Sequence, residues 1–159
     1  MSIKSAIIAL IKILRLIRLD QKLKSTTNDF ANEYQTLYDV TEKIGIHAQG
    51  KKKKRGEVVD IAASDGYSQS STLGFYRLGF EGLAVEMDSN NFSTLSFLYR
   101  NFPNVRLIKA RVTPLNVASI LSAAEIKKNF TILNLDIDSY DLHVIDAILQ
   151  AGYLPIVIS

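Results

Sequence analysis

From residue 57 onward, short apolar runs alternate with longer stretches that repeat an apolar residue every three or four positions. The runs begin near Val58, Leu83, Val105, Thr131 and Pro155. Their starts lie 25, 22, 26 and 24 residues apart, which is the length of a strand–helix repeat. Runs that are apolar at nearly every position are typical of parallel strands covered on both faces. The pattern therefore predicts a doubly wound α/β fold with a mostly parallel sheet over residues 57–159.

Glycine and proline divide this region at the expected places. A helix is predicted from about Ser68, and Gly79 and Gly152 stand where helices should end. Thr113-Pro114 is predicted to open a further helix, with Thr as the N-cap and Pro at the first helical position. A sheet that stopped at the fifth strand would expose a long apolar edge. Either more sequence follows Ser159 or another element covers that edge, and we expect a truncation.

Residues 1–50 are predicted to form a separate helical section, joined to the domain by a lysine-rich loop over residues 51–56. Residues 3–24 have a basic stripe on an otherwise apolar helix, formed by Lys4, Lys12, Arg15, Arg18 and Lys22. Such a helix either docks on its own domain or contacts a membrane surface or a partner. A second helix, around Asn28 to Ile44, is expected to pack over the domain or line its cleft.

Composition excludes several kinds of site. The chain has 159 residues, no cysteine and two histidines, so it has neither a disulfide, a thiolate metal site nor a three-histidine site. The net charge is +3, and the run Lys51 to Arg55 alone exceeds it. That run could bind nucleic acid phosphates, but its shortness and lack of aromatics favour a solvated hinge. We expect a cytoplasmic protein, with peripheral membrane contact through residues 3–24 as an alternative.

Carboxylates follow several of the predicted strands. In an open, Rossmann-like sheet, ligands bind at the carboxyl ends of the strands. Asp60 ends the first strand, and a loop of small residues follows it to Gly66. Glu86 ends the second strand, where a fixed carboxylate can accept both hydroxyls of a ribose. An NAD-dependent dehydrogenase would need Gly-x-Gly-x-x-Gly after the first strand, and an acid within that loop would repel a pyrophosphate. The loop therefore disfavours a dinucleotide.

Three segments together resemble an S-adenosylmethionine-dependent methyltransferase of the FkbM-like group. They are Val-Val-Asp-Ile-Ala-Ala-Ser-Asp-Gly from Val58, Ala-Val-Glu-Met-Asp from Ala84, and Leu-Asp-Ile-Asp-Ser-Tyr-Asp from Leu135. In that group the first segment usually reads Val-Asp-x-Gly-Ala-Asn-Asp-Gly, followed shortly by Ser or Thr. The matching positions are Asp60, Ala63, Asp65, Gly66 and the cluster Ser70-Ser71-Thr72. The resemblance covers residues 57–159.

The resemblance implies a class I methyltransferase-like fold with S-adenosylmethionine as cofactor. Asp60 and the loop of Ala62, Ala63, Ser64, Asp65 and Gly66 would hold its amino-acid end. Glu86 would bind the ribose and Met87 would pack on the adenine, with Ala110, Arg111 and Val112 on the far side of the base. Ala62 departs from the pattern, because the group has glycine there. The extra methyl could be accommodated by a small backbone shift or could crowd the methionine end.

The segment after the fourth strand is the candidate catalytic region. Side chains alternate along a strand, so Asp136 and Asp138 would point the same way and meet a substrate together. We assign Asp138 as the base or hydroxyl-orienting group, with Asp136 beside it. The pair could instead hold Mg²⁺, which nothing else in the sequence supports and for which we assign no site. Alternatively the two bind backbone N–H groups while Asp141 caps the following helix. His143 could be a base if it turned inward, but we expect it to face solvent.

The sequence thus predicts an S-adenosylmethionine-dependent O-methyltransferase that acts on a saccharide or a small natural product, as members of that group often do. A non-catalytic binding or scaffold protein of the same fold and an RNA methyltransferase are the alternatives. Nucleic acid is the less favoured partner, because the basic run is short and borders a buried strand.

Overall fold

The computed structural model describes residues 31–43, 56–68 and 70–159. Within them a single sheet of five parallel strands has the order β3-β2-β1-β4-β5. The strands are β1 (Glu57–Ile61), β2 (Glu81–Glu86), β3 (Val105–Lys109), β4 (Ile132–Leu135) and β5 (Val157–Ile158). Each begins within about two residues of its predicted start, which is the usual uncertainty of element boundaries. The predicted strands and their parallel arrangement are confirmed.

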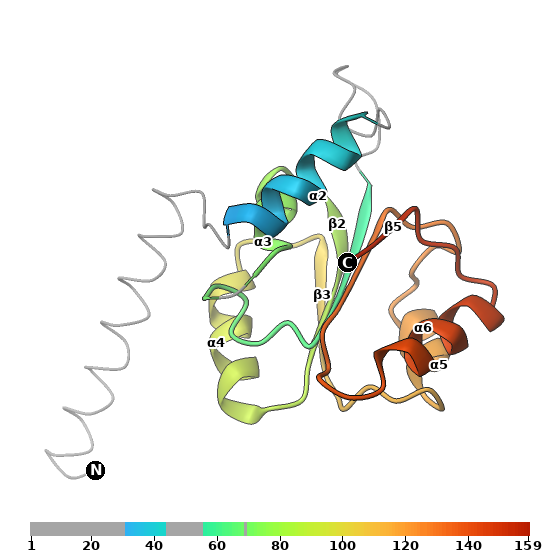
Figure 1. Cartoon of the computed structure of the whole chain (residues 1–159). Coiled ribbons are helices and arrows are strands. Elements are labelled where there is room, and N and C mark those ends of the chain that lie inside the picture. The colour runs from blue at the N-terminus through green and yellow to red at the C-terminus, as the bar shows by residue number, and fades with distance from the viewer. Residues whose placement is uncertain (1–30, 44–55, 69) are drawn as a thin grey trace, which may run out of the picture.

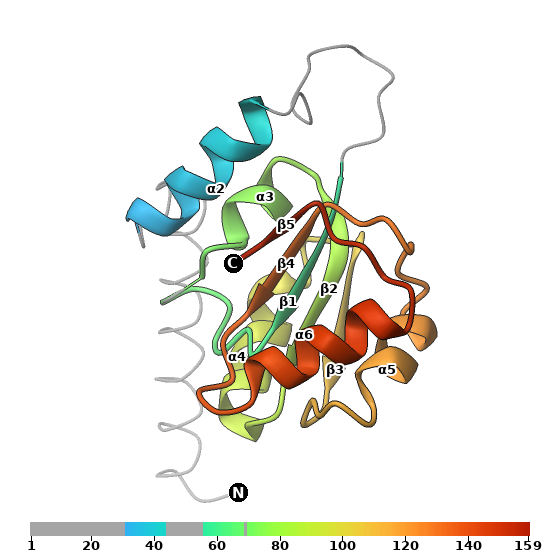
Figure 2. The ribbon, with the colours of Figure 1, turned by 45° about the vertical axis from the view of Figure 1, so that its right-hand side comes forward.

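Helices cover both faces of the sheet, so the fold is a doubly wound, Rossmann-like α/β fold (Figures 1 and 2). On one face lie α2 (Ala31–Lys43), α3 (Leu73–Arg77) and α4 (Ser89–Tyr99). On the other face lie α5 (Val117–Ala123) and α6 (Asp141–Gln150). The strand order reverses direction between β1 and β4, and such a switch point is where ligands bind in this architecture.

Alternation along β1 assigns its side chains to two separate cores. Val58 belongs to the core under α2, α3 and α4, together with Phe75 and Leu95. Val59 and Ile61 belong to the core under α5 and α6. Each such fully buried side chain stabilises the fold by roughly 1.5–3 kcal/mol relative to an exposed one. Asp60 lies between Val59 and Ile61 in sequence and so points toward the α3 side, where its partners are found.

The second predicted N-terminal helix is present as α2, and it packs over the domain. Leu37 is buried in the first core, and the ring of Tyr34 meets Phe75 edge-on with centroids 5.3 Å apart. The Tyr34 ring also lies directly over Gly74, where a Cβ atom would collide with it. The first predicted helix over residues 3–24 and the lysine run 51–55 lie outside the described residues.

Among residues 31–43, 56–68 and 70–159, no helix combines the length and the apolar character needed to cross a membrane.

Two helix starts differ from the predictions. The helix expected from about Ser68 begins at Leu73, because the Asp65 carboxylate accepts hydrogen bonds from the N–H groups of Tyr67 and Ser68 and closes a turn there. The helix expected to open at Thr113-Pro114 begins at Val117 instead. Turn residues precede it, and the Thr113 carbonyl accepts from the Val117 N–H at 3.0 Å.

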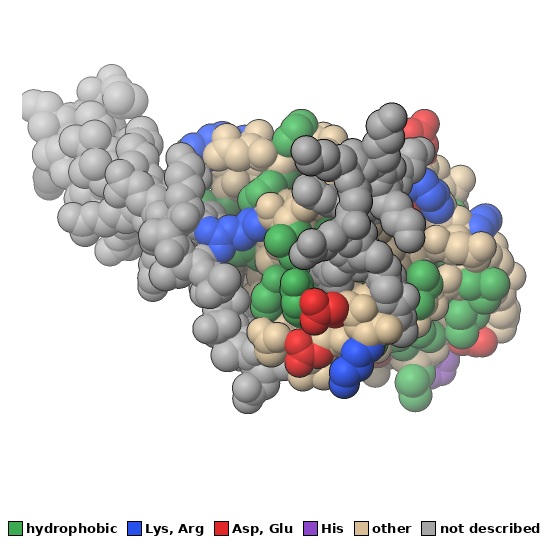
Figure 3. All heavy atoms as spheres, turned by 90° about the horizontal axis from the view of Figure 1, so that it is seen from above, with side chains coloured by type: hydrophobic (Ala, Val, Ile, Leu, Met, Phe, Trp, Pro, Cys, Tyr) green, Lys and Arg blue, Asp and Glu red, His purple; other side chains and the backbone are tan. Residues whose placement is uncertain are grey.

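The amino ends of the strands carry paired charges. Glu57 is buried, and its carboxylate lies 3.8 Å from both Arg106 and Lys127. Figure 3 views the molecule from this end. There the described acidic and basic side chains are interspersed with hydrophobic and uncharged ones. The residues that carry candidate chemistry lie at the opposite, carboxyl end.

Candidate functional site

The carboxyl ends of the strands form two adjoining pockets. The first has a volume of about 190 Å³ and is bounded by the ends of β1, β2, β3 and β4. Its walls include Ala62, Glu86, Met87, Ala110, Arg111, Val112, Asp136, Asp138 and Tyr140. They include most of the residues that we predicted from the sequence to bind the ribose, to contact the adenine or to take part in catalysis. They come from four separate loops, which the parallel sheet brings to one edge.

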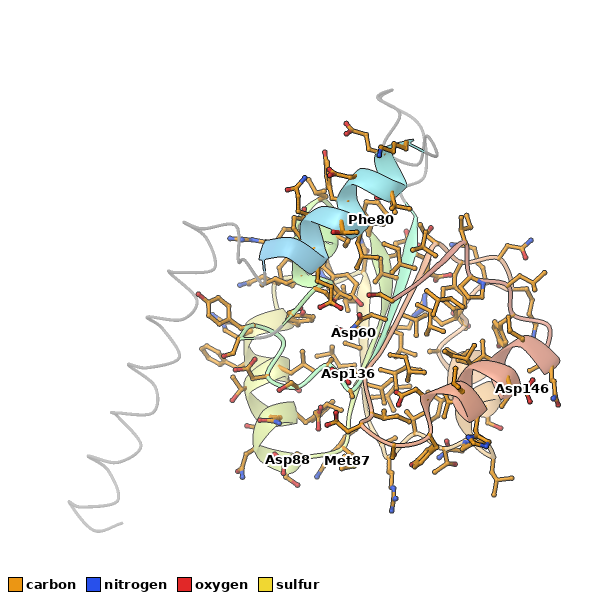
Figure 4. The ribbon with its side chains drawn as sticks, in the orientation of Figure 1. Asp60, Phe80, Met87, Asp88, Asp136 and Asp146 are labelled. Atoms are coloured by element: carbon orange, nitrogen blue, oxygen red, sulfur yellow. The ribbon has the colours of Figure 1, made fainter. Side chains whose placement is uncertain are left out.

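The second pocket has a volume of about 370 Å³ and lies beside the loop after β1. Its walls include Glu33, Asp60, Ala62, Ala63, Ser64, Ser71, Asn134, Asp136 and Ser159. The two pockets share Ala62 and Asp136. In Figure 4, Asp60 and Asp136 lie near the lower ends of the strands with Met87 and Asp88 beyond them. Phe80 lies at the opposite end and Asp146 on the outer helix α6.

Glu86 connects the loops that follow β1 and β2. Only 6% of the residue is exposed, and one carboxylate oxygen accepts a hydrogen bond from the Ser64 N–H at 2.9 Å. The other accepts from the Asp88 N–H at 2.6 Å. A carboxylate has about four lone-pair positions, so these two bonds leave capacity for ligand hydroxyls. Glu86 therefore holds the first pocket in shape and can still accept from a ligand.

Asp60 is held by a buried polar network. It is 1% exposed, and its carboxylate accepts hydrogen bonds from the Thr72 hydroxyl at 2.6 Å and the Asn134 amide at 2.8 Å. Burial raises the pKa of Asp60, and the charges of Glu86 and Glu33 raise it further, while the two hydrogen bonds oppose the rise. The network fixes the direction of a carboxylate that borders the second pocket.

Sequence reasoning did not identify Asn134. Its amide oxygen also accepts from the Ser71 hydroxyl at 3.0 Å, so it joins the serine cluster to Asp60. The sequence did mark Asn134 as unusual, because it is the one polar side chain within the four residues of β4. A polar residue in a strand covered on both faces needs hydrogen-bond partners, and those partners are on the neighbouring element.

Ala62 has a left-handed backbone, with φ of 67°. Its N–H and that of Ala63 both donate to the Val85 carbonyl at 3.0 Å, which locks the turn. The chain therefore takes the conformation that favours glycine without having the glycine. This conformation costs an L-residue roughly 1–2 kcal/mol. Ser64 also lies in this region, with φ of 51°, so the loop is tightly wound over a short span.

Asp65 and Gly66 lie outside the walls of both pockets. The Asp65 carboxylate accepts from two backbone N–H groups and from the Ser68 hydroxyl at 2.6 Å. Gly66 has φ of 72°, and a Cβ there would meet Leu95 and Tyr99 of α4. In this structure both residues shape the loop and seat it on α4, and their proposed contact with a cofactor stays a prediction.

The alternation argument for Asp136 and Asp138 is wrong, because β4 ends at Leu135. Asp138 has φ of 59°, a turn conformation that aspartate tolerates better than most residues. Both carboxyl groups are exposed and both residues line the first pocket, but only Asp136 also lines the second. Among the described residues, no three His, Cys, Asp or Glu side chains converge as a metal site would require.

Asp141 and His143 do not line either pocket. Asp141 does not cap its own helix, because its carboxylate accepts from the Ile137 N–H at 2.9 Å and closes the loop before α6. His143 is exposed on α6, as expected. Tyr140, which sequence reasoning did not select, lines the first pocket, and its hydroxyl donates to the Val112 carbonyl at 3.0 Å. This bond joins the loops that follow β3 and β4.

No protein-family model matches the chain, and no curated protein sequence matches it. Solved structures of similar fold include a fibrillarin/Nop5p complex, with a TM-score of 0.48 and 16% identity, covering 76% of this chain and 54% of that one. Another is a TehB-like SAM-dependent methyltransferase from Corynebacterium glutamicum, with a TM-score of 0.47 and 15% identity, covering 84% and 62%. A third is WbdD, with a TM-score of 0.47 and 14% identity, covering 77% and 26%. The chain thus spans less than two thirds of each of these structures.

Proposed function

We propose that this protein is an S-adenosylmethionine-dependent methyltransferase that methylates a hydroxyl group of a saccharide or small natural product. The observation that carries the proposal is the pair of adjoining, acid-lined pockets at the switch point of the sheet. Glu86 closes one pocket at the end of β2, and Asp60 borders the other at the end of β1. The FkbM-like resemblance of the loops in question supports the same proposal.

The residues present suit the cofactor. Its sulfonium and ammonium groups are cationic. Among the described residues, the two pockets are bordered by the acids Glu33, Asp60, Glu86, Asp136 and Asp138 and by a single arginine, Arg111. Met87, which is 63% exposed, offers an apolar surface to the adenine. Glu86 offers hydroxyl acceptors for the ribose, and the second pocket offers carboxylates for the amino-acid end. When bound, the cofactor supplies an electrophilic methyl group.

The acceptor oxygen has to be aligned with that methyl group and must lose a proton. Asp136 lies where the two pockets meet, whereas Asp138 borders only the first. The placement therefore favours Asp136 as the proton acceptor and gives Asp138 a supporting role in orienting the hydroxyl. This proposal exchanges the roles that the sequence analysis assigned to the two aspartates.

Cofactor binding is tested by isothermal titration of the full chain with S-adenosylhomocysteine. Met87→Ala should weaken binding about three- to tenfold, because it removes apolar surface under the adenine. Leu142→Ala is the matched control, since Leu142 is 79% exposed on α6 and borders neither pocket. Absence of binding by both the wild type and Ala62→Gly would contradict the proposal.

The role of Glu86 is tested separately by Glu86→Gln, which keeps the size of the side chain. We expect at least a tenfold loss of affinity, because the amide is a weaker acceptor for ribose hydroxyls than the carboxylate. Thermal melting of the same sample checks that the loop contacts to Ser64 and Asp88 survive. An unchanged affinity would show that the ribose is bound elsewhere.

Turnover is tested with labelled S-adenosylmethionine and a panel of saccharides and natural products. Asp136→Asn should lower turnover by about 10²–10⁴-fold, a larger effect than the loss of S-adenosylhomocysteine affinity, which should be at most about tenfold for one exposed carboxylate of the pocket wall. Asp146→Asn, on the outer surface of α6, is the control. Binding without any methyl transfer would favour the non-catalytic alternative.

A further inference from the structure

The wall of the second pocket includes a residue from outside the strand-end loops. Glu33 lies in the first turn of α2, and it borders the pocket together with Asp60 and Asp136. The remaining polar groups of the wall are hydroxyl and amide side chains, and the described wall contains no lysine or arginine. The pocket therefore favours an ammonium group beside its carboxylates, and it offers a carboxylate of the same ligand only hydroxyl, amide and backbone N–H donors.

Two contacts orient the exposed Glu33 toward the pocket. Tyr34, the next residue, packs on Phe75 and over Gly74, which seats α2 against α3. The Glu33 carboxylate itself accepts a hydrogen bond from the Ser159 hydroxyl at 3.3 Å. The helix thus presents a carboxylate to the pocket from the side of the N-terminal section.

The charge of Glu33 affects the Asp60 carboxyl group of the same pocket. It contributes to the raised pKa of the Asp60 carboxyl group, after burial and alongside Glu86. Two carboxylates that border one pocket repel each other, and a cation between them relieves that repulsion. The amino-acid end of S-adenosylmethionine carries such a cation in its ammonium group, next to a carboxylate that would have to lie away from the two acids.

We infer that Glu33 binds the ammonium group of the cofactor from the α2 side of the second pocket, so that the N-terminal helix is part of the cofactor site. The inference rests on the proposed function. It adds to the site a residue of α2, which lies outside the loops at the strand ends. It predicts that α2 contributes to the binding of the amino-acid end of the ligand and not to the binding of the adenosine end.

The test compares two ligands by isothermal titration, S-adenosylhomocysteine and 5′-methylthioadenosine, which lacks the amino-acid end. Glu33→Gln should weaken S-adenosylhomocysteine binding by about three- to tenfold, the range expected for one partly exposed ion pair. The same variant should leave 5′-methylthioadenosine affinity unchanged. Glu42→Gln removes an exposed acid from the same helix outside the pocket wall, and it should affect neither ligand.

Ser159→Ala separates the charge of Glu33 from its hydrogen bond. It removes the hydroxyl that contacts Glu33 but leaves the carboxylate, so any loss of S-adenosylhomocysteine affinity should be smaller than that of Glu33→Gln. A loss as large as that of Glu33→Gln would assign the effect to the hydrogen bond and overturn the role of the charge. Equal S-adenosylhomocysteine affinity in wild type and Glu33→Gln would overturn the inference, as would tighter binding by the variant. Equal weakening of both ligands would also overturn it, by indicating a general distortion. Failure of the wild type to bind S-adenosylhomocysteine would instead contradict the proposed function.

Discussion

The Asn134 side chain on β4 donates a hydrogen bond of 2.8 Å to the Asp60 carboxylate on the adjacent strand β1. The two residues are direct partners in the register of the parallel pair. Ser71 donates to the other end of the same amide, so one side chain connects β1, β4 and the segment before α3. The shape of the second pocket depends on this connection.

Replacing Asn134 with leucine should lower the free energy of unfolding by about 2–3 kcal/mol, because a buried carboxylate loses a charge-assisted hydrogen bond. Urea denaturation measures the change. Asn129→Leu, the same substitution at an exposed position before β4, should stay within about 0.5 kcal/mol of the wild type. Similar losses at both positions would show that the Asp60 contact is not the cause.

Ala62→Gly should stabilise the fold by about 0.5–1 kcal/mol, because relief of the left-handed backbone outweighs the added chain entropy of glycine. Ala63→Gly is the adjacent control. Ala63 is buried and is not among the residues with positive φ, so glycine there should destabilise by about 1 kcal/mol. Denaturation midpoints of the two variants should therefore move in opposite directions. Movement in the same direction would contradict the assigned conformation of Ala62.

Gly66→Ala should destabilise by about 2–4 kcal/mol, since the added methyl meets Leu95 and Tyr99 as well as an unfavourable φ. Gly152→Ala isolates the second of these causes. Gly152 has φ of 78°, and a Cβ there meets nothing within 4 Å, so the expected loss is about 1 kcal/mol. The difference between the two variants measures how tightly the loop is packed on α4. Equal losses of stability would mean that Leu95 and Tyr99 of α4 move to make room for the methyl group at little cost.

The raised pKa of Asp60 predicts how stability varies with pH. An aspartate in the unfolded chain titrates near pH 3.9, and the folded carboxyl titrates higher. Between those two values the folded state binds more protons, so the contribution of Asp60 to stability decreases as pH rises through this window and is constant above it. Relative to wild type, Asp60→Asn should therefore gain stability as the pH is raised from about 4.

This pH effect is measured by urea denaturation of both proteins at a series of pH values. Asp146→Asn, an exposed substitution on α6, controls for the loss of one surface charge. A relative stability of Asp60→Asn that falls with rising pH would show that the pKa of Asp60 is lowered in the folded state.

The strands were predictable because burial on both faces leaves a continuous apolar run, as at Val58-Val59 and Ile132-Leu133. The carboxyl-edge residues followed from them, since parallel strands all end at the same edge. The start of α3 was not predictable from periodicity, because the Asp65 turn competes with helix formation for the N–H groups that a helix would use.

Side-chain contacts between segments far apart in the sequence could not be predicted either. The bond from Tyr140 to Val112 and the bond from Thr72 to Asp60 join residues whose partners depend on how the layers pack. The left-handed conformation of Ala62 was hidden for a different reason. Alanine gives no local signal for positive φ, so the sequence did not predict this conformation.

The wall that the two pockets share at Ala62 and Asp136 makes this site suitable for fragment-based ligand discovery. A flat aromatic fragment and a small amine could each be screened against one pocket, and then joined by a short linker that passes Ala62 and Asp136. The second fragment would then bind at the high effective concentration set by the linker, so the affinity of the joined molecule could exceed that of either part by orders of magnitude. The side chains at positions 62 and 136 are the ones that such a linker would contact.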